Sequence, residues 1–365
     1  MIGQKTLTAG EIAGGVEKHV AEVSRRLVDA GHEVTAFVRA KYTPERPKIF
    51  QGVHLEYAPT IYTKNLETII YAFTATIKAI FGRYDVIHYH GVGPATLTWI
   101  ARLLSRSTII VTFHSRDQFH QKWGWFARKY LSIGEWAAVM LPHYCISVSH
   151  VIQVYCRDTF GREVVYIPNG AEVVEVSDSD ELEKFGLEPN QYLVNVGRLV
   201  PQKGLHFLIE AFRGIETDMN LVFVGAPSFT DEYYTRLREL AKGDARIKFL
   251  GFQKGRELDQ LYGNAYLYVH PSEAEGLPLT ILEAMSHGIA PLVSDIPENV
   301  EAIHGAGFKF ESGNIDQLHH KLSELIKAPK LVAERAEEAQ ATVDIHFNWD
   351  VIADRVEAVY VTARH

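Results

Sequence analysis

The sequence predicts an α/β protein with two domains, each built on a mostly parallel sheet that helices cover. At 365 residues the chain is too long for one ordinary hydrophobic core. Short runs rich in β-branched residues alternate with helical patterns along almost the whole length, which is typical of strands joined by crossover helices. Hydrophobic residues make up 47% and charged residues 22% of the chain, the balance of a folded globular protein.

The first half of the chain begins with a predicted helix between glycines. This helix covers Val16–Ala30, after Gly14 and Gly15, and Gly31 follows it at the C′ position that glycine favours. The predicted strands of this half are Val34–Val38, Val86–Tyr89, Ile109–Phe113 and Tyr144–Val148. A doubly wound domain also needs a central strand before the two glycines, where only Met1 and Ile2 remain. Either this first strand is truncated or another segment fills its place.

A second alternating series starts near Tyr192. Its predicted strands are Tyr192–Val196, Leu221–Val224, Ile247–Leu250, Tyr266–Val269 and Ala290–Val293. The turn Pro168-Asn169-Gly170 and the acidic stretch after it lie between the two series. We therefore expect an N-terminal domain of residues 1–170, a C-terminal domain of residues 171–344 and a final segment, 345–365, that carries a helix over Phe347–Ala363.

Composition excludes several classes of protein. The net charge of -8 argues against a dedicated nucleic-acid binder. The two cysteines, Cys145 and Cys156, offer neither a disulfide framework nor a zinc site and fit a reducing compartment. The N-terminus lacks the pattern of a secretory signal, and no apolar run is long enough to span a bilayer. We expect a cytoplasmic protein, with room for peripheral contact with the inner face of the membrane.

The segment Pro271–Asp295 carries the strongest chemical signal. It reads as a strand end, a tight loop, a helix that starts near Pro278 and ends at Gly288, and a further strand. The free amides near Gly276–Thr280 then form a helix N-terminus, which favours an anion. Glu275 precedes this helix and Glu283 lies on it. Ionised carboxylates only accept hydrogen bonds, so sugar and ribose hydroxyls are suitable partners for them.

A second loop supplies positive charge. In Val196–Gly204 a strand leads into a loop with Gly197, Arg198 and Lys203, and a helix follows near Leu205. Because the carboxyl ends of parallel strands share one edge of a sheet, both cations can reach the same anion. The two loops together predict a site where a departing diphosphate is stabilised without a metal ion.

These two segments, VGRLVPQKG and EAEGLPLTILEAM, resemble the nucleotide-sugar domain of the family-four retaining glycosyltransferases with the GT-B fold. The resemblance extends to GGVEKHV, FHSRD and IPNGA and covers nearly the whole chain. It implies two Rossmann-like domains that face an interdomain cleft, with the C-terminal helix crossing back to the N-terminal, acceptor-binding domain. The C-terminal domain would bind the nucleotide sugar.

The resemblance also implies roles for individual residues. Glu275 would bind donor-sugar hydroxyls, Glu283 the ribose, and Arg198 with Lys203 the diphosphate. His114 would lie near the reacting carbon as a further catalytic residue. The remaining donor-binding candidates are Gly197, Gly276, Leu279, Thr280, Gly14 and Gly15, and the acceptor-side candidates are Asp117 and His120.

The expected activity is retaining transfer from a nucleotide-diphosphate sugar, a UDP-hexose before a GDP-hexose, to a saccharide or lipid-linked acceptor in polysaccharide or glycoconjugate synthesis. The basic and aromatic segment Lys122–Tyr130 suits either a membrane interface or ordinary helix packing. His88 and His90 share one strand face, but no further ligand at suitable spacing completes a metal site, so no metal and no cofactor are expected.

Two alternatives remain open. A sugar-nucleotide epimerase of the same architecture would need acid and base residues across the cleft, for which His114 and Asp117 are candidates. A binding protein that retained the nucleotide pocket without turnover is the other. Observation of the donor alone by NMR separates these classes, because an epimerase converts the sugar and a transferase releases free nucleotide diphosphate.

Overall fold

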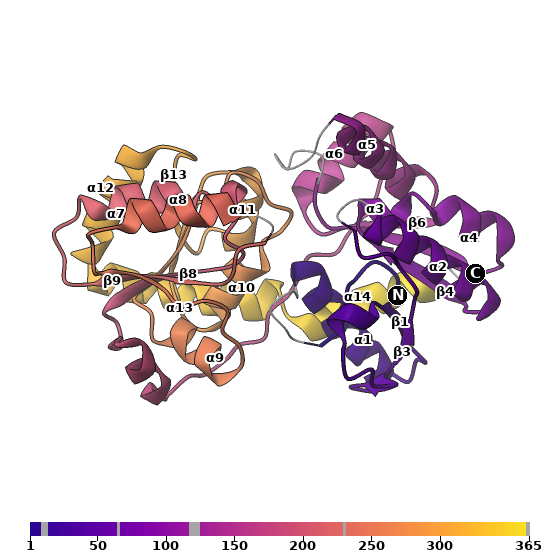
Figure 1. Cartoon of the computed structure of the whole chain (residues 1–365), viewed down its shortest axis with the longest axis horizontal. Coiled ribbons are helices and arrows are strands. Elements are labelled where there is room, and N and C mark those ends of the chain that lie inside the picture. The colour runs from indigo at the N-terminus through magenta and orange to yellow at the C-terminus, as the bar shows by residue number, and fades with distance from the viewer. Residues whose placement is uncertain (9–13, 64–65, 117–124, 229–230, 363–365) are drawn as a thin grey trace. The chain divides into compact units, whose positions relative to one another are not determined.

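The computed structural model describes residues 1–8, 14–63, 66–116, 125–228 and 231–362, without the side chains of 125–128. It divides into two compact units (Figure 1). The first contains Met1–Asn169 and Trp349–His365, and the second contains Gly170–Asn348. The division after Asn169 lies within the predicted Pro168–Gly170 turn, and the chain returns to the first unit at Trp349.

The second unit contains a six-stranded sheet in the order β10-β9-β8-β11-β12-β13, with every neighbouring pair parallel. The strands are β8 (Tyr192–Val196), β9 (Asn220–Val224), β10 (Ile247–Phe249), β11 (Leu267–His270), β12 (Pro291–Ser294) and β13 (Phe308–Phe310). This is the strand order 3-2-1-4-5-6 of a doubly wound Rossmann fold, in which a crevice forms where the order reverses. Here that point lies between β8 and β11.

Helices alternate with these strands, and Figure 1 shows α7 and α8 on one side of the sheet with α9 and α13 on the other. The helices of the unit are α7 (Leu205–Arg213), α8 (Asp231–Ala241), α9 (Arg256–Gly263), α10 (Leu279–Ser286), α11 (Pro297–Ile303), α12 (Ile315–Ile326) and α13 (Pro329–His346). Strand side chains such as Leu193 and Phe223 pack with helix side chains such as Leu208 and Leu322 in one buried core. Two-sided covering explains why these strands are almost continuously apolar.

The first unit has a second parallel arrangement. β4 (Val86–His90), β5 (Thr108–Phe113), β6 (Tyr144–Ser147) and β7 (Val165–Tyr166) form one sheet. β1 (Thr35–Val38), β3 (Val53–Tyr57) and β2 (Ile49–Phe50) form another, in which only β2 is antiparallel.

Residues 1–5 occupy the position between β1 and β4. The Ile2 amide donates to His88 O at 2.9 Å, and the Phe37 amide donates to Met1 O at 3.0 Å. Ile2 is fully buried and forms a parallel bridge with Tyr89. Met1 and Ile2 themselves therefore occupy the place of the central strand, because they form hydrogen bonds with both neighbouring strands.

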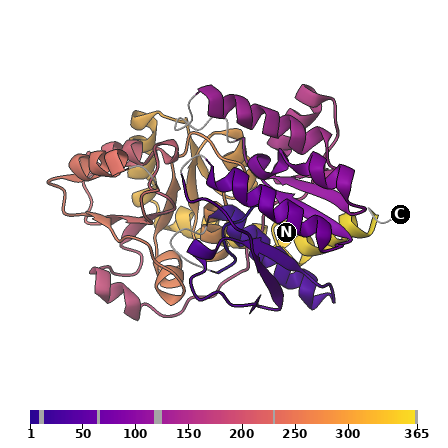
Figure 2. The same cartoon turned by 45° about the vertical axis from the view of Figure 1, so that its right-hand side comes forward.

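The helices of this unit include α1 (Gly15–Asp29), α2 (Glu67–Phe81), α3 (Val92–Ala95), α4 (Thr98–Leu104), α5 (Trp125–Met140) and α6 (His150–Phe160). The C-terminal helix α14 (Trp349–Thr362) packs against α1, as Figures 1 and 2 show in yellow and indigo. Arg26 of α1 donates to Asp350 Oδ1 at 2.6 Å, and Trp349 is buried beside His19. The predicted return of the C-terminal helix to the N-terminal domain is thus observed.

The predicted strands all exist, and none of their ends is shifted by more than one residue. Sequence patterns missed four short strands, namely β2, β3, β7 and β13. Three of them have only two or three residues, too few for a period-two pattern to emerge. Pro278 is the N-cap of α10 and has an extended conformation. The helix therefore starts at Leu279, one residue after the start predicted at Pro278.

Candidate active site

Two loops meet at the carboxyl ends of β8 and β11. The Glu273 amide of the second loop donates to Gln202 O of the first at 2.9 Å. Gly204 has φ of +63°, and a Cβ on it would lie 2.1 Å from Pro271 O. Only glycine permits this close approach without displacing the backbone. The fold therefore brings the predicted cationic loop against the predicted carboxylate loop.

Lys203 and Glu275 form a buried ion pair between these loops. Lys203 Nζ lies 2.6 Å from Glu275 Oε1, and the side chains are 12% and 10% exposed. His270 Nε2 lies 2.9 Å from the same oxygen. Because a carboxylate only accepts, Nε2 carries the proton and Nδ1 accepts from the Tyr268 hydroxyl at 2.9 Å. Both contacts use Oε1, and no bond from the described residues to Oε2 is found, which leaves Oε2 for a ligand hydroxyl.

The protonation states follow from this arrangement. Burial alone raises the pKa of the Glu275 carboxyl, but Lys203 and His270 outweigh it and hold the pKa well below its usual range. Burial lowers the pKa of His270, and the Lys203 charge lowers it further. At neutral pH the site therefore contains an ionised Glu275 and a neutral His270.

The other predicted donor-site residues surround this pair. Arg198 lies on the same loop as Lys203, and its exposed side chain forms no hydrogen bond or ion pair with any described residue. Glu283, on α10, accepts from the Tyr262 hydroxyl at 3.2 Å. Leu279 and Thr280 begin α10 after Gly276, where helix geometry leaves amides without intrahelical acceptors. Gly197 follows β8 with φ of +150°.

The predicted residues of the first unit lie near the start of α1 and the end of β5. Gly14 is the N-cap of α1, and its amide donates to Glu17 Oε2 at 2.9 Å. Gly15 is the first helical residue. His114 follows β5 and is 7% exposed. Asp117 and His120 lie outside the described residues, as do Lys122–Gly124 and the side chains of residues 125–128.

His114 belongs to a histidine cluster that sequence spacing did not reveal. His90 Nδ1 lies 3.2 Å from His114 Nε2, and the ring centroids of His19 and His114 are 4.8 Å apart. His88 shares the strand face with His90, as predicted, but bonds Tyr360 and Thr112 instead. The argument that no further ligand accompanies His90 is therefore wrong. The three members come from α1, β4 and the end of β5, so their distance in sequence concealed them.

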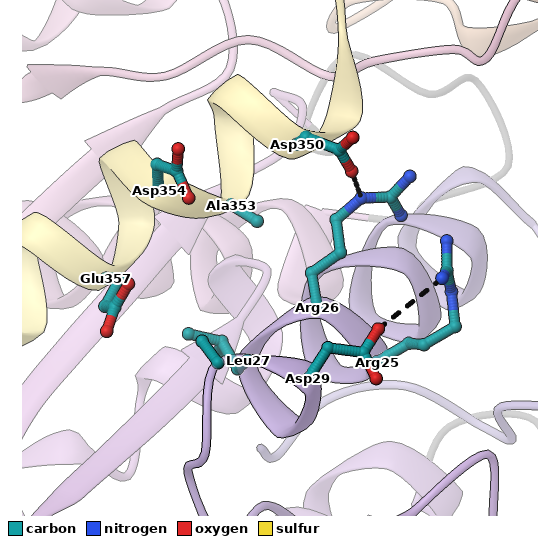
Figure 3. A pocket seen from close by; sticks show the side chains of 9 residues that line it. Arg25, Arg26, Leu27, Asp29, Asp350, Ala353, Asp354 and Glu357 are labelled. Carbon is teal, nitrogen blue, oxygen red and sulfur yellow. Dashed lines mark hydrogen bonds and ion pairs between the residues drawn. The ribbon is translucent and has the colours of Figure 1, made fainter.

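A separate hollow lies where α1 meets α14 (Figure 3). Arg26–Asp350 and Arg25–Asp29 ion pairs line it, with Glu357 nearby. None of the predicted site residues contributes to it. Both arginines that line it are paired with carboxylates, so we assign it to packing between the two helices.

His270 and Tyr262 are the functional candidates that sequence reasoning missed. His270 is the last residue of β11, five positions before Glu275. A polar residue at the carboxyl end of a strand next to the topological switch was a usable signal. Tyr262 lies on α9, and only the tertiary fold brings it to Glu283.

Comparison with known proteins agrees with this geometry. Residues 13–174 match the family described as Glycosyltransferase Family 4, and residues 178–342 match Glycosyl transferases group 1. The phosphatidyl-myo-inositol mannosyltransferase of Mycolicibacterium smegmatis is 24% identical over 96% of this chain and 91% of its own length.

Solved structures show the same fold. Anabaena HepE in complex with UDP and glucose is 21% identical, with a TM-score of 0.82 over 98% of this chain and 100% of that chain. Sucrose-phosphate synthase from Thermosynechococcus elongatus is 20% identical, with a TM-score of 0.86 over 99% and 97%.

The two units have the GT-B fold of these solved structures. The chain belongs to the group 1 glycosyltransferases. Within the described part of the chain, no helix is both long and apolar enough to cross a bilayer.

Proposed function

We propose that this glycosyltransferase moves a hexose from a nucleotide-diphosphate sugar, a UDP-hexose in preference to a GDP-hexose, to a saccharide or lipid-linked acceptor with retention of the anomeric configuration. The observation that carries the proposal is the largely buried Lys203–Glu275 pair. No described residue bonds Glu275 Oε2 or the side chain of Arg198, which lies on the same loop as Lys203. The known structure of Anabaena HepE with UDP and glucose supports this class of donor.

The site suits the departure of a diphosphate. The acceptor oxygen bonds to the anomeric carbon as the bond from that carbon to the phosphate oxygen breaks. The hydroxyl proton passes to the departing phosphate oxygen, which leaves as nucleotide diphosphate. Arg198, Lys203 and the first amides of α10 would stabilise its negative charge, and each such group contributes about 2.7–4 kcal/mol by analogy with oxyanion donors. No metal ion is required by this proposal.

The carboxylates would select the organic part of the donor. Glu275 Oε2 accepts from hydroxyls of the sugar, and Glu283 accepts from the ribose. Glu283 is held in place by the Tyr262 hydroxyl. In the first unit, His114 would face the reacting carbon as a neutral group, because burial holds its pKa well below the usual range.

A donor panel tests the proposal. UDP-, GDP- and ADP-hexoses are incubated with the protein, with and without a lipid-linked acceptor, and the products are analysed by NMR. We expect nucleotide diphosphate and an α-linked product from an α-linked donor. Glu275→Gln should lower kcat/KM by about 100-fold or more. An epimerised donor, or a product of inverted configuration, contradicts the proposal.

Glu273→Gln is the matched control for this experiment. Glu273 lies two residues from Glu275 in the same loop, and its side chain is exposed. Its loop contact uses the backbone amide, which the substitution retains. Activity should remain at the level of the unmodified protein. Equal losses in both variants would indicate damage to the loop rather than removal of a sugar contact.

The first unit also has a surface that supports a lipid-linked acceptor and peripheral membrane contact. Exposed apolar side chains lie on α2, α4 and α5, and α4 contacts both of the other helices. They are Phe81, Trp99, Leu103, Leu104, Ile133, Trp136 and Met140. Phe81 is 80% and Leu103 73% exposed. Exposed Arg83, Arg102 and Arg106 lie on α4 or within two residues of the ends of α2 and α4, as expected of a surface that meets anionic lipid.

Vesicle sedimentation tests this membrane contact. The protein should pellet with vesicles of anionic phospholipid and remain in solution with zwitterionic vesicles. The double variant Leu103→Ser, Leu104→Ser should reduce the bound fraction while transfer to a water-soluble acceptor persists. Unchanged sedimentation of the variant would contradict the assignment of this surface.

A further inference from the structure

The histidine cluster of His19, His90 and His114 carries an inference beyond sugar transfer. We propose that these three residues form a binding site for one divalent transition-metal ion, with a fourth coordination position left for water or an anion. One ligand nitrogen from each residue lies within 4.8 Å of the others. Three imidazoles with an open position are a known coordination set for zinc.

The distances fit a metal ion. The nitrogens His90 Nδ1 and His114 Nε2 are 3.2 Å apart. Two nitrogens bound to zinc at about 2.0–2.1 Å in tetrahedral geometry lie about 3.3 Å apart. The observed pair is therefore spaced almost as two ligands of one ion would be. The rings of His19 and His114 stand at 82° to one another, with their centroids 4.8 Å apart.

His19 supplies the third ligand atom with its lone pair already available. Its Nδ1 lies 3.0 Å from Asn169 Oδ1. An amide oxygen only accepts, so Nδ1 carries the proton and Nε2 carries the lone pair. Nε2 is buried and has no hydrogen-bond partner among the described residues. A ligand histidine fixed by an oxygen on its other nitrogen is the usual arrangement in metal sites.

The other two histidines need one change of tautomer. His90 Nε2 lies 3.4 Å from the Met1 sulfur, which only accepts, so His90 carries its proton there. His90 Nδ1 then accepts from His114 Nε2. Metal binding moves the His114 proton from Nε2 to Nδ1, and Nε2 becomes the ligand. No proton is released overall, because all three rings remain neutral.

Burial favours this neutral state. It lowers the pKa of His19 to about 4 and holds the pKa values of His90 and His114 well below their usual range. Because the cluster contains no carboxylate, the bound ion keeps its full positive charge. An anion or hydroxide is the expected fourth ligand.

Cobalt titration of the chelator-treated full chain, without sugar donor, tests the site. We expect one equivalent of Co²⁺ to give the visible absorption of a four- or five-coordinate ion, and Zn²⁺ to displace it. His19→Gln and His90→Gln should each weaken binding by about 100-fold or more, since even outer groups change metal affinity 10–100-fold.

Two controls separate this cluster from other histidines. His88→Gln removes a buried ring 4.1 Å from His90 that lies outside the cluster. His346→Gln disrupts the stacked His304–His346 pair, whose centroids are also 4.1 Å apart. Binding should be unchanged in both controls. Loss of binding in either control but not in the cluster variants would overturn the proposal.

X-ray absorption of the zinc-loaded, unsubstituted protein decides the matter if a cluster variant does not fold. Three imidazole nitrogens at about 2.0–2.1 Å are expected. Two or fewer imidazoles, or no binding at all, overturns the proposal. The result is independent of sugar transfer, since the measurement uses no donor and no activity.

Discussion

At the scale of single residues, the environment of Glu275 depends on two partners, Lys203 and His270. Lys203 supplies charge, whereas His270 donates a hydrogen bond that fixes the orientation of the carboxylate. Tyr268 in turn fixes the tautomer of His270. The sequence pointed to Glu275 and Lys203 but did not predict that the two side chains pair directly.

His270 is predicted to act as a positioning residue for Glu275. His270→Leu should lower kcat/KM by about 10-fold or more, because a hydrogen bond to a charged group contributes about 1.5–3 kcal/mol. His270→Gln retains an N–H donor and should recover most of the loss. Steady-state kinetics with the preferred donor measures both variants. Equal impairment of the two would show that ring packing, not donation to Glu275, is what matters.

The ion pair also predicts a dependence of stability on pH. The folded-state pKa of Glu275 lies below its unfolded value of about 4.3. Its stabilisation is therefore complete above that value and declines as the pH falls below it. Relative to Glu275→Gln, the native protein should lose unfolding free energy between pH 5 and pH 3. Urea titrations at several pH values measure this difference, and a constant difference contradicts the assignment.

At the scale of elements, turns at strand ends place the catalytic loops. The 3₁₀ turn Pro201–Lys203 ends at Gly204, which has a left-handed conformation and starts α7. The second loop is held by Asn299 of α11, whose side-chain amide donates to Ser272 Oγ at 3.1 Å and Ser294 Oγ at 2.8 Å. Both loops are thus fixed from several elements.

Gly204→Ala is predicted to disturb the approach of these loops. The added Cβ meets Pro271 O at 2.1 Å, in addition to the strain of positive φ. Gly243→Ala is the control, because Gly243 has φ of +86° with open space around it. We expect a loss of about 1–2 kcal/mol in the control and a larger loss in Gly204→Ala. Urea unfolding and donor affinity are measured, and equal effects would contradict the steric argument.

At the scale of the whole molecule, the chain folds as two compact units, and its last helix belongs to the first. Trp349 is 1% exposed and packs beside His19, so α14 is part of the core of that unit. The second unit has its own core across the six-stranded sheet. Separate cores predict separate responses to mutation and to ligand.

Calorimetry should resolve these responses. Trp349→Ala should destabilise the first unit by about 3–5 kcal/mol, because it leaves a large cavity. Nucleoside diphosphate at 100 times its dissociation constant should stabilise the second unit by about 2.7 kcal/mol. Val351→Ala, at a side chain 55% exposed on the same helix, is the control for the first measurement. A single transition shifted equally by Trp349→Ala and by nucleotide would contradict independent cores.

The sequence by itself determined the α/β class, the long strands, helix α1 and the candidate charges at positions 198, 203, 275 and 283. Local patterns carry this information, because strand and helix periodicity and turn residues act over a few neighbouring positions. Short strands such as β2 and β7 could not be predicted from the sequence, because two residues show no period.

Only the tertiary structure decided which side chains meet. The 3-2-1-4-5-6 strand order places His270 and Lys203 on one carboxylate, although they are separated by more than sixty positions. It likewise brings together His19, His90 and His114 from three elements. Such contacts depend on the order in which strands pair, and that order results from burying all the helices and strands at once rather than from any local segment.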